Sequence, residues 1–322
     1  MAAESRDDII NHSHPAEYSS EQPQWLRDRL KWFTGLKFGI IVHWGPYSQW
    51  DCYESWPLVP ADAWARPEGL VEWNERDRDL TRFQKDYWEL NRTFNPESFK
   101  PEEWAELFRN AGAKYVALTT KHHDGFCLWD TRTTVYRITH LSCPYSQNPR
   151  SNVIREAFAA FRSSGLAVSC YFSKSDWKHP SYWSPDFPVT DRNPNYDTGK
   201  NPERWESFVR FVHEQIRELM SDYGKIDLLW LDGGQVRPPK QDIRMNEIAR
   251  MAREFQPDLI IADRTVGGEF ENIITPEGHI PEEPLGVPWE ACIPLGKNWK
   301  YVSNESHKST GELIRMLVET VS

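Results

Sequence analysis

The fold is decided by residues 225–234, which read Lys-Ile-Asp-Leu-Leu-Trp-Leu-Asp-Gly-Gly. We interpret residues 226–230 as a short strand buried on both faces, a pattern typical of parallel sheets. Asp232 then lies where the strand meets the following loop, and in a parallel α/β barrel that edge carries the chemistry. The alternative is that Asp232 caps the next helix, and this stretch alone does not decide between the two.

Strands and helices alternate along the rest of the chain. Further strands are predicted at residues 38–45, 115–120, 166–172 and 259–264, and helices at residues 23–34, 96–111, 153–164, 202–223, 243–255 and 309–321. This alternation is typical of βα units around a parallel sheet. After Arg264 only a short strand at residues 289–293 is indicated before the last helix. We therefore predict an α/β fold of the (β/α)8 TIM-barrel type, irregular or incomplete.

The domain organisation follows from the same pattern. We expect one catalytic barrel domain over residues 21–322, preceded by a disordered polar tail at residues 1–20. Residues 47–91 contain prolines and a run of charged residues. They are predicted to form a long insertion, a loop with helical pieces that covers the barrel mouth.

Composition excludes several classes of function. The formal net charge of −10, from 48 acidic and 38 basic residues, argues against nucleic acid or an anionic membrane as the main partner. No apolar run reaches membrane-spanning length and no signal peptide is visible, so the expected location is the cytoplasm, or outside the cell if the N-terminus was trimmed. Five scattered cysteines without a CxxC motif predict buried thiols rather than disulfides or a zinc site.

Polar side chains stand at the ends of five predicted strands: His43, the pair His122 and His123, Tyr171, Asp232 and Arg264. Each alone could be a structural hydrogen-bond partner, but five on consecutive strands indicate one site at the barrel mouth. Adjacent histidines on an extended backbone point to opposite faces, so we expect no catalytic metal and no cofactor. A serine triad is not indicated either, because the chain lacks a GxSxG motif.

The remaining chemistry is that of carboxylates around a polyhydroxylated ligand. Retaining glycoside hydrolysis needs a nucleophilic carboxylate and a protonated acid about 5 Å apart. Asp232 fits the nucleophile, because it is a short side chain at a rigid strand end. The acid could be Glu277, on a loop that could close over the mouth, or Glu290, whose neighbour Trp289 would disfavour its charge. The 16 tryptophans include several in loop-like surroundings, where an indole can stack on a sugar.

Three blocks of sequence carry a family resemblance: residues 38–45 (Phe-Gly-Ile-Ile-Val-His-Trp-Gly), residues 113–126 with His-His-Asp-Gly-Phe at their end, and residues 230–233 (Trp-Leu-Asp-Gly). They resemble the signature blocks of the family 29 glycoside hydrolases, the α-L-fucosidases, and the resemblance covers roughly residues 25 to 322. It implies a retaining mechanism with Asp232 as nucleophile and either Glu277 or Glu290 as acid/base, of which we favour Glu277. It further implies fucose hydroxyl ligands and pocket-lining residues, which are His43, His122, His123, Arg264, Trp299, Trp56 and Tyr171.

The resemblance implies an exo-α-L-fucosidase that releases terminal α-linked L-fucose from an oligosaccharide or glycoconjugate. The blocks at residues 275–277 and 288–290 look like the branch that prefers α-1,3/1,4 linkages. The alternatives are a catalytically inactive fucose-binding barrel and a retaining glycosidase for another sugar. Family members usually continue into a further strand and a β-sandwich, and this chain ends at Ser322 before both. The expected fold therefore lacks that C-terminal domain, and the oligomeric state is left open.

Overall fold

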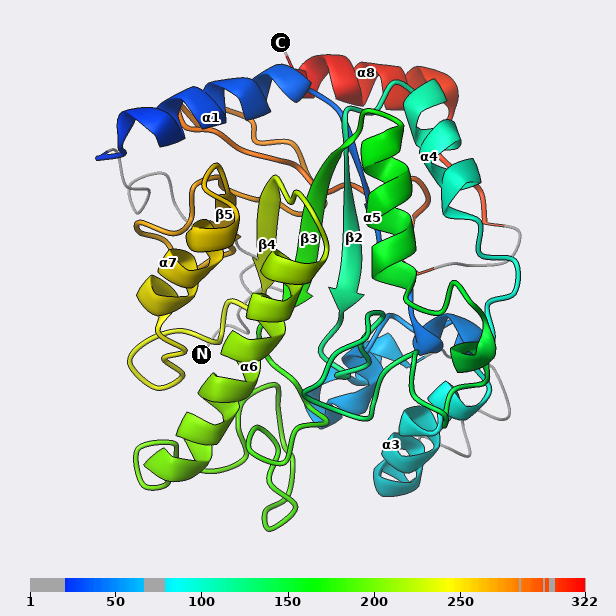
Figure 1. The fold of residues 1–322 in the computed structure, drawn as a ribbon, viewed down its shortest axis with the longest axis vertical. Helices are drawn as coiled ribbons and strands as arrows, with labels where there is room; N and C mark the ends of the chain where they lie inside the picture. Colours follow the sequence, from blue (N-terminus) through cyan, green and yellow to red (C-terminus); the bar gives the residue numbers. More distant parts are fainter. Residues whose placement is uncertain (1–20, 67–78, 284, 298, 301–304, 322) are drawn as a thin grey trace.

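Five parallel strands form the centre of the fold in the computed structural model, which describes residues 21–66, 79–283, 285–297, 299–300 and 305–321. The strands are neighbours in chain order (Figure 1): β1 (Gly39–Val42), β2 (Tyr115–Lys121), β3 (Ala167–Ser173), β4 (Leu228–Asp232) and β5 (Ile260–Asp263). All four pairings are parallel. All five long strands predicted from the sequence are therefore confirmed.

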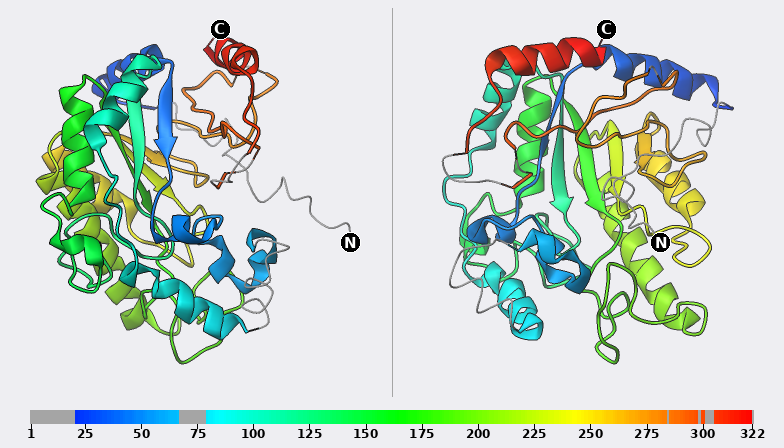
Figure 2. Two further views of the ribbon diagram at one scale, coloured as in Figure 1. Left: turned by 90° about the vertical axis from the view of Figure 1, so that its right-hand side faces the viewer. Right: turned by 180° about the vertical axis from the view of Figure 1, so that it is seen from behind.

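Helices surround the sheet and connect its strands. They are α1 (Gln24–Leu36), α3 (Leu80–Trp88), α4 (Pro101–Asn110), α5 (Val153–Ser163), α6 (Pro202–Asp222), α7 (Met245–Phe255) and α8 (Thr310–Val321). Helices α5, α6 and α7 cover one face of the sheet, while α1 and α8 lie at the end where the strands begin (Figures 1 and 2). No described helix has the length and apolar character needed to cross a membrane.

Two predicted elements differ from the observed ones. Helix α4 begins at Pro101 rather than near residue 96, because proline is favoured in the first helical turn and excludes the residue before it from helical geometry. The strand predicted at residues 289–293 does not form, and this stretch makes only single bridges, Ile274 with Trp289 and Glu277 with Cys292. Prolines at 276, 288 and 294 lack the N–H groups that a continuous ladder needs.

Successive residues of each strand face opposite sides of the sheet. On the helix-covered face, Leu118, Cys170 and Leu229 belong to the larger hydrophobic cluster. On the inner face, a second cluster contains Tyr115, Tyr171, Leu228, Trp230, Ile260 and Ala262. Asp232 follows Trp230 by two residues, so it projects from the inner face at the carboxyl end of β4.

The sheet is an incomplete barrel in the part of the chain that the structure describes. Strand β5 pairs with β4 and not with β1, and the loops after β5 lie on the inner side of the sheet (Figure 2, orange). The irregular or incomplete barrel expected from the sequence is therefore confirmed. Residues 1–20, predicted to be a disordered tail, lie outside the described residues, and the single domain over residues 21–322 stays a prediction. All five cysteines are buried thiols.

The insertion after β1 lies at the carboxyl ends of the strands, as expected (Figure 1). Its described part contains α3 and the short 3₁₀ helices η3 (Pro46–Trp50), η4 (Trp56–Leu58), η5 (Pro60–Ala65) and η6 (Leu90–Arg92). A fifth 3₁₀ helix, η7 (Pro144–Gln147), precedes α5. The insertion thus brings residues 51–58 to the mouth of the barrel.

Candidate active site

Asp232 is the centre of a cluster built from three strand ends. Tyr171 Oη, on β3, donates a hydrogen bond of 2.6 Å to Asp232 Oδ2. Arg264, which follows β5, places Nη1 3.2 Å from Asp232 Oδ1, and His123 Nε2 lies 3.5 Å from Oδ2. Burial alone would raise the pKa of Asp232, but Arg264, His123 and Tyr171 together hold that pKa well below its ordinary value. Asp232 is therefore a carboxylate at neutral pH, the form that a nucleophile needs.

The imidazoles beside this carboxylate are neutral hydrogen-bonding groups. His43 lies directly after β1, and its ring centroid is 4.7 Å from that of Tyr171. Burial lowers the pKa of His43 to about 4 and that of His122 well below its ordinary value. At neutral pH these two rings carry no charge. They can therefore bind hydroxyl groups without competing with Arg264 for Asp232.

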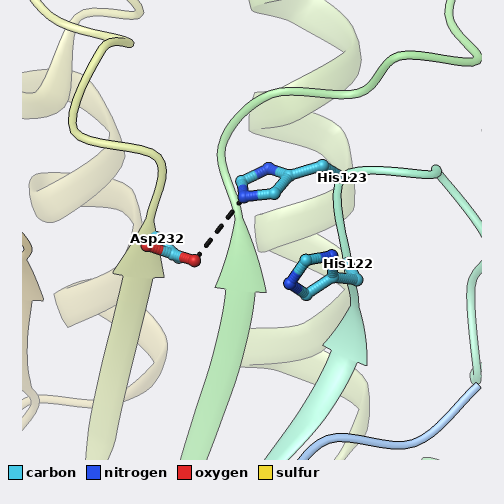
Figure 3. A group of neighbouring side chains, drawn as sticks. All are labelled: His122, His123 and Asp232. Carbon is cyan, nitrogen blue, oxygen red and sulfur yellow. Dashed lines mark ion pairs between the residues drawn. The ribbon is translucent and has the colours of Figure 1, made fainter. Parts of the chain in front are cut away.

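The histidine pair does not point in opposite directions as the sequence suggested, and that prediction is wrong. The pairing of β2 with β3 shifts register between Thr119 and Lys121, and the strand ends before the pair. The ring centroids of His122 and His123 are 4.7 Å apart, and both rings approach Asp232 (Figure 3). A bulge followed by a loop releases the alternation that an extended strand would impose.

This arrangement raises the question of a metal ion. One ligand atom from each of His122, His123 and Asp232 lies within 4.8 Å of the others. Two observations disfavour a cation here. Ligand atoms around zinc lie closer together, because each metal–ligand bond is about 2 Å long. The guanidinium of Arg264 already contacts the same carboxylate and would repel a metal.

Two tryptophans were predicted to line the pocket, and the structure places them differently. Trp56, at the start of η4, has its ring centroid 5.0 Å from that of His123 and 5.8 Å from that of His122. Trp299 packs against the inner cluster of the sheet. It also lines a cavity of about 470 Å³ together with Met316 of α8. The imidazole cluster thus has Trp56 beside it, and Trp299 lies toward the open side of the barrel.

Glu277 and Glu290 have different surroundings. Glu277 pairs with Arg264 Nη2, so one guanidinium contacts both this carboxylate and Asp232. Its side chain is 22% exposed. Glu290 instead accepts hydrogen bonds from Tyr115 Oη at 2.6 Å and from Trp230 Nε1 at 3.1 Å. Burial raises the pKa of Glu290. Because both donors belong to the inner cluster, Glu290 lies deeper in the barrel, and Glu277 lies at the mouth.

Sequence reasoning missed several residues at the site. Glu54, on the insertion, is buried, and burial together with the charge of Asp232 raises its pKa to about 8. In the sequence it resembles any other acidic residue of a charged loop. Three hydroxyl residues were also missed, each of which contacts Nδ1 of one site histidine: Thr119, Ser55 and Ser175. Only the position of Thr119 on an inner-facing strand position could have suggested it.

Comparisons with known proteins agree with this geometry. A family model described as Alpha-L-fucosidase matches residues 8–322. The tissue alpha-L-fucosidase of Rattus norvegicus is 28% identical over 331 residues, covering 96% of this chain and 64% of the relative. The plasma alpha-L-fucosidase of Homo sapiens is 26% identical over 322 residues, covering 93% and 63%. The chain thus spans less than two thirds of the length of these curated relatives.

Solved structures share the fold. Alpha-L-fucosidase isoenzyme 1 from Paenibacillus thiaminolyticus is 30% identical with a TM-score of 0.68, and the match covers 92% of this chain and 68% of that one. Alpha-L-fucosidase AlfC from Lactobacillus casei, in complex with its alpha-L-fucose product, is 24% identical with a TM-score of 0.67. That match covers 91% of this chain and 87% of that one, and it supports the fold alone. The match of the family model over nearly the whole sequence shows that the chain belongs to the alpha-L-fucosidase family.

Proposed function

We propose that the chain is the catalytic barrel of a retaining exo-α-L-fucosidase that removes terminal α-linked L-fucose from an oligosaccharide or glycoconjugate. One observation carries this proposal: the ionised Asp232 at the mouth of the barrel, with Arg264 joining it to a second carboxyl group, Glu277. Two carboxyl groups at one mouth are what a double displacement requires.

In the first step, an oxygen of Asp232 attacks the anomeric carbon as the glycosidic bond breaks. Glu277 gives its proton to the departing oxygen, and a covalent fucosyl ester forms on Asp232. In the second step, Glu277 takes a proton from water, whose oxygen attacks the same carbon. The ester bond breaks, and L-fucose leaves with its original anomeric configuration. Tyr171 and His123 hold the carboxylate during both steps.

Recognition of the sugar falls to uncharged groups. The neutral rings of His43 and His122 are suited to hydroxyl groups, and Trp56 beside them offers an indole face to the apolar side of a deoxyhexose. The finer proposal is a preference for α-1,3/1,4 linkages, supported by the blocks at residues 275–277 and 288–290. AlfC, which shares the fold, was crystallised with Fuca(1,6)GlcNAc, so a substrate panel must include that linkage.

The test is hydrolysis of an aryl α-L-fucoside by Asp232→Asn. We expect kcat to fall by more than about a thousandfold, because a nucleophile has no substitute. Circular dichroism and a thermal melt check the fold. The matched control is Asp222→Asn, whose side chain is 43% exposed at the end of α6, and it should keep full activity. Near-normal activity of Asp232→Asn would overturn the proposal.

Two alternatives give different outcomes in the same experiment. A catalytically inactive fucose-binding barrel would bind L-fucose in calorimetry while the unmodified protein releases no aryl group. A retaining glycosidase for another sugar would reject the fucoside and cleave another member of an aryl glycoside panel. Fucoside hydrolysis lost only in Asp232→Asn excludes both.

A further inference from the structure

The three site histidines share an arrangement that the reaction scheme does not explain. In each ring, Nδ1 contacts a serine or threonine hydroxyl. His43 Nδ1 lies 2.6 Å from Thr119 Oγ1, and His123 Nδ1 lies 2.6 Å from Ser175 Oγ. His122 Nδ1 contacts Ser55 Oγ in the same way. With Nδ1 engaged, each ring has only Nε2 left for the site. The hydroxyl partner thereby influences whether Nε2 donates or accepts a hydrogen bond.

The partners of Thr119 determine the state of His43. A hydroxyl has one hydrogen, and Thr119 Oγ1 donates it to the carbonyl oxygen of Val42 at 3.1 Å, an atom that can only accept. Thr119 Oγ1 must therefore accept from His43, so the proton of this ring is on Nδ1. Since the lowered pKa keeps His43 neutral, its Nε2 has a free lone pair. This nitrogen can only accept a hydrogen bond.

The surroundings of His123 require the opposite state. Its Nε2 is buried and makes no full hydrogen bond within the described residues, and it lies 3.5 Å from Asp232 Oδ2. A lone pair facing an ionised carboxylate would be repelled, so this nitrogen carries the proton. Nδ1 then accepts from Ser175, whose oxygen is also approached by Gln235 Nε2 at 3.5 Å. A proton supplied by Gln235 leaves the serine hydrogen for His123.

We propose that Thr119 and Ser175 are positioning residues that fix opposite tautomers in the site, with His43 protonated on Nδ1 and His123 on Nε2. His43 then accepts a hydrogen bond from a sugar hydroxyl, and His123 donates one to the nucleophile. The two hydroxyls have separate consequences. Loss of Thr119 weakens substrate binding, and loss of Ser175 disturbs the orientation of Asp232.

This inference deepens the proposed function and rests on it for its kinetic consequences, but its structural part is measured without substrate. Protein labelled with ¹⁵N in histidine gives two-bond ¹H–¹⁵N correlation spectra, in which Nδ1–H and Nε2–H tautomers have different patterns. The chain has ten histidines, and the signals of interest are assigned by their loss in His43→Gln and His123→Gln. We expect an Nδ1–H pattern for His43 and an Nε2–H pattern for His123.

The variants Thr119→Val and Thr119→Ser form a matched pair. Valine keeps the shape but removes the hydroxyl, so the His43 pattern should change and KM should rise about 5- to 100-fold with a smaller change in kcat. Serine restores the hydroxyl and should restore both readings. Ser175→Ala should change the His123 pattern and lower kcat more than it raises KM. Thermal melts show that each variant is folded.

The outcomes separate this inference from the proposed function. An Nε2–H pattern for His43 in the unmodified protein, or an unchanged pattern in Thr119→Val, overturns the tautomer assignment whatever the activity. The expected tautomers in a protein that hydrolyses no fucoside would support the assignment and defeat the proposed function. Equal kinetic effects in Thr119→Val and Thr119→Ser would overturn the role of the hydroxyl.

Discussion

Replacing the two candidate acids should give opposite results, because their contacts differ. Glu277→Gln removes a carboxyl group at the mouth, while Arg264 keeps its contact with Asp232. Loss of general acid catalysis lowers a rate by about 10²- to 10⁴-fold when the leaving group needs a proton. We expect this loss for a phenyl fucoside and a much smaller one for a dinitrophenyl fucoside, whose leaving group needs no proton.

Glu290→Ala should instead weaken the fold. Both carboxylate oxygens accept hydrogen bonds from buried donors, Tyr115 Oη at 2.6 Å and Trp230 Nε1 at 3.1 Å. Each buried donor left without a partner costs about 1–3 kcal/mol, so the variant should lose about 2–6 kcal/mol of unfolding free energy. Glu290→Gln keeps one acceptor oxygen and should lose about half as much. Neither variant should depend on the leaving group.

The assay compares kcat/KM for the two aryl fucosides, with and without azide, alongside urea unfolding. Azide needs no general base, so it should rescue Glu277→Ala on the dinitrophenyl fucoside and give a fucosyl azide product. Glu282→Gln, at an exposed position, is the matched control and should behave as the unmodified protein. The reasoning is refuted if azide rescue and leaving-group dependence occur in Glu290→Ala and not in Glu277→Ala.

Three further predictions follow from buried groups. Since the pKa of Glu54 is raised from 4.5 to about 8, its stabilising contribution is full below pH 4.5 and is lost as the pH rises through about 8. Urea unfolding should find Glu54→Gln gaining up to about 5 kcal/mol over the unmodified protein across that range, and parallel pH curves would contradict this. Lys174→Met leaves the buried carboxylate of Asp263 unpaired and should cost about 3–5 kcal/mol in the same assay, whereas an unchanged midpoint would refute the pairing. A chelator should leave fucoside hydrolysis unchanged, and inactivation reversed by added zinc would assign a metal to His122, His123 and Asp232.

The strands could be predicted from sequence because they are buried on both faces. Residues of β2, β4 and β5 are buried without exception, so each reads as an apolar run that ends at a polar residue. The limits were less accurate. Strand β4 starts at Leu228 rather than at residue 226, because the Asp227 carboxylate accepts from Val168 N and pairs with Arg29. These contacts join residues far apart in the chain, and no local pattern encodes them.

The candidate site was predictable in part for the same reason. The parallel order of the strands brings His43, Tyr171, Asp232 and Arg264 to one mouth, and their strand-end positions indicated this. The direction of His122 and His123 depends on a register shift, which alternation along a strand does not predict. The burial of Glu54 depends on how the insertion folds back over the barrel. The hydroxyl partners of the histidines are common residue types, recognisable only through distances.

The most direct measurement asks which side chain becomes covalently bound to the sugar. The protein is incubated with a 2-deoxy-2-fluoro-fucosyl fluoride, which slows hydrolysis of a glycosyl ester, and its peptides are analysed by mass spectrometry. A fluorofucosyl group on the peptide containing Asp232, absent after Asp232→Asn, is the predicted result. The same group on another carboxylate, or inactivation with Asp232 unmodified, would contradict the assignment of the nucleophile and with it the reading of the barrel mouth.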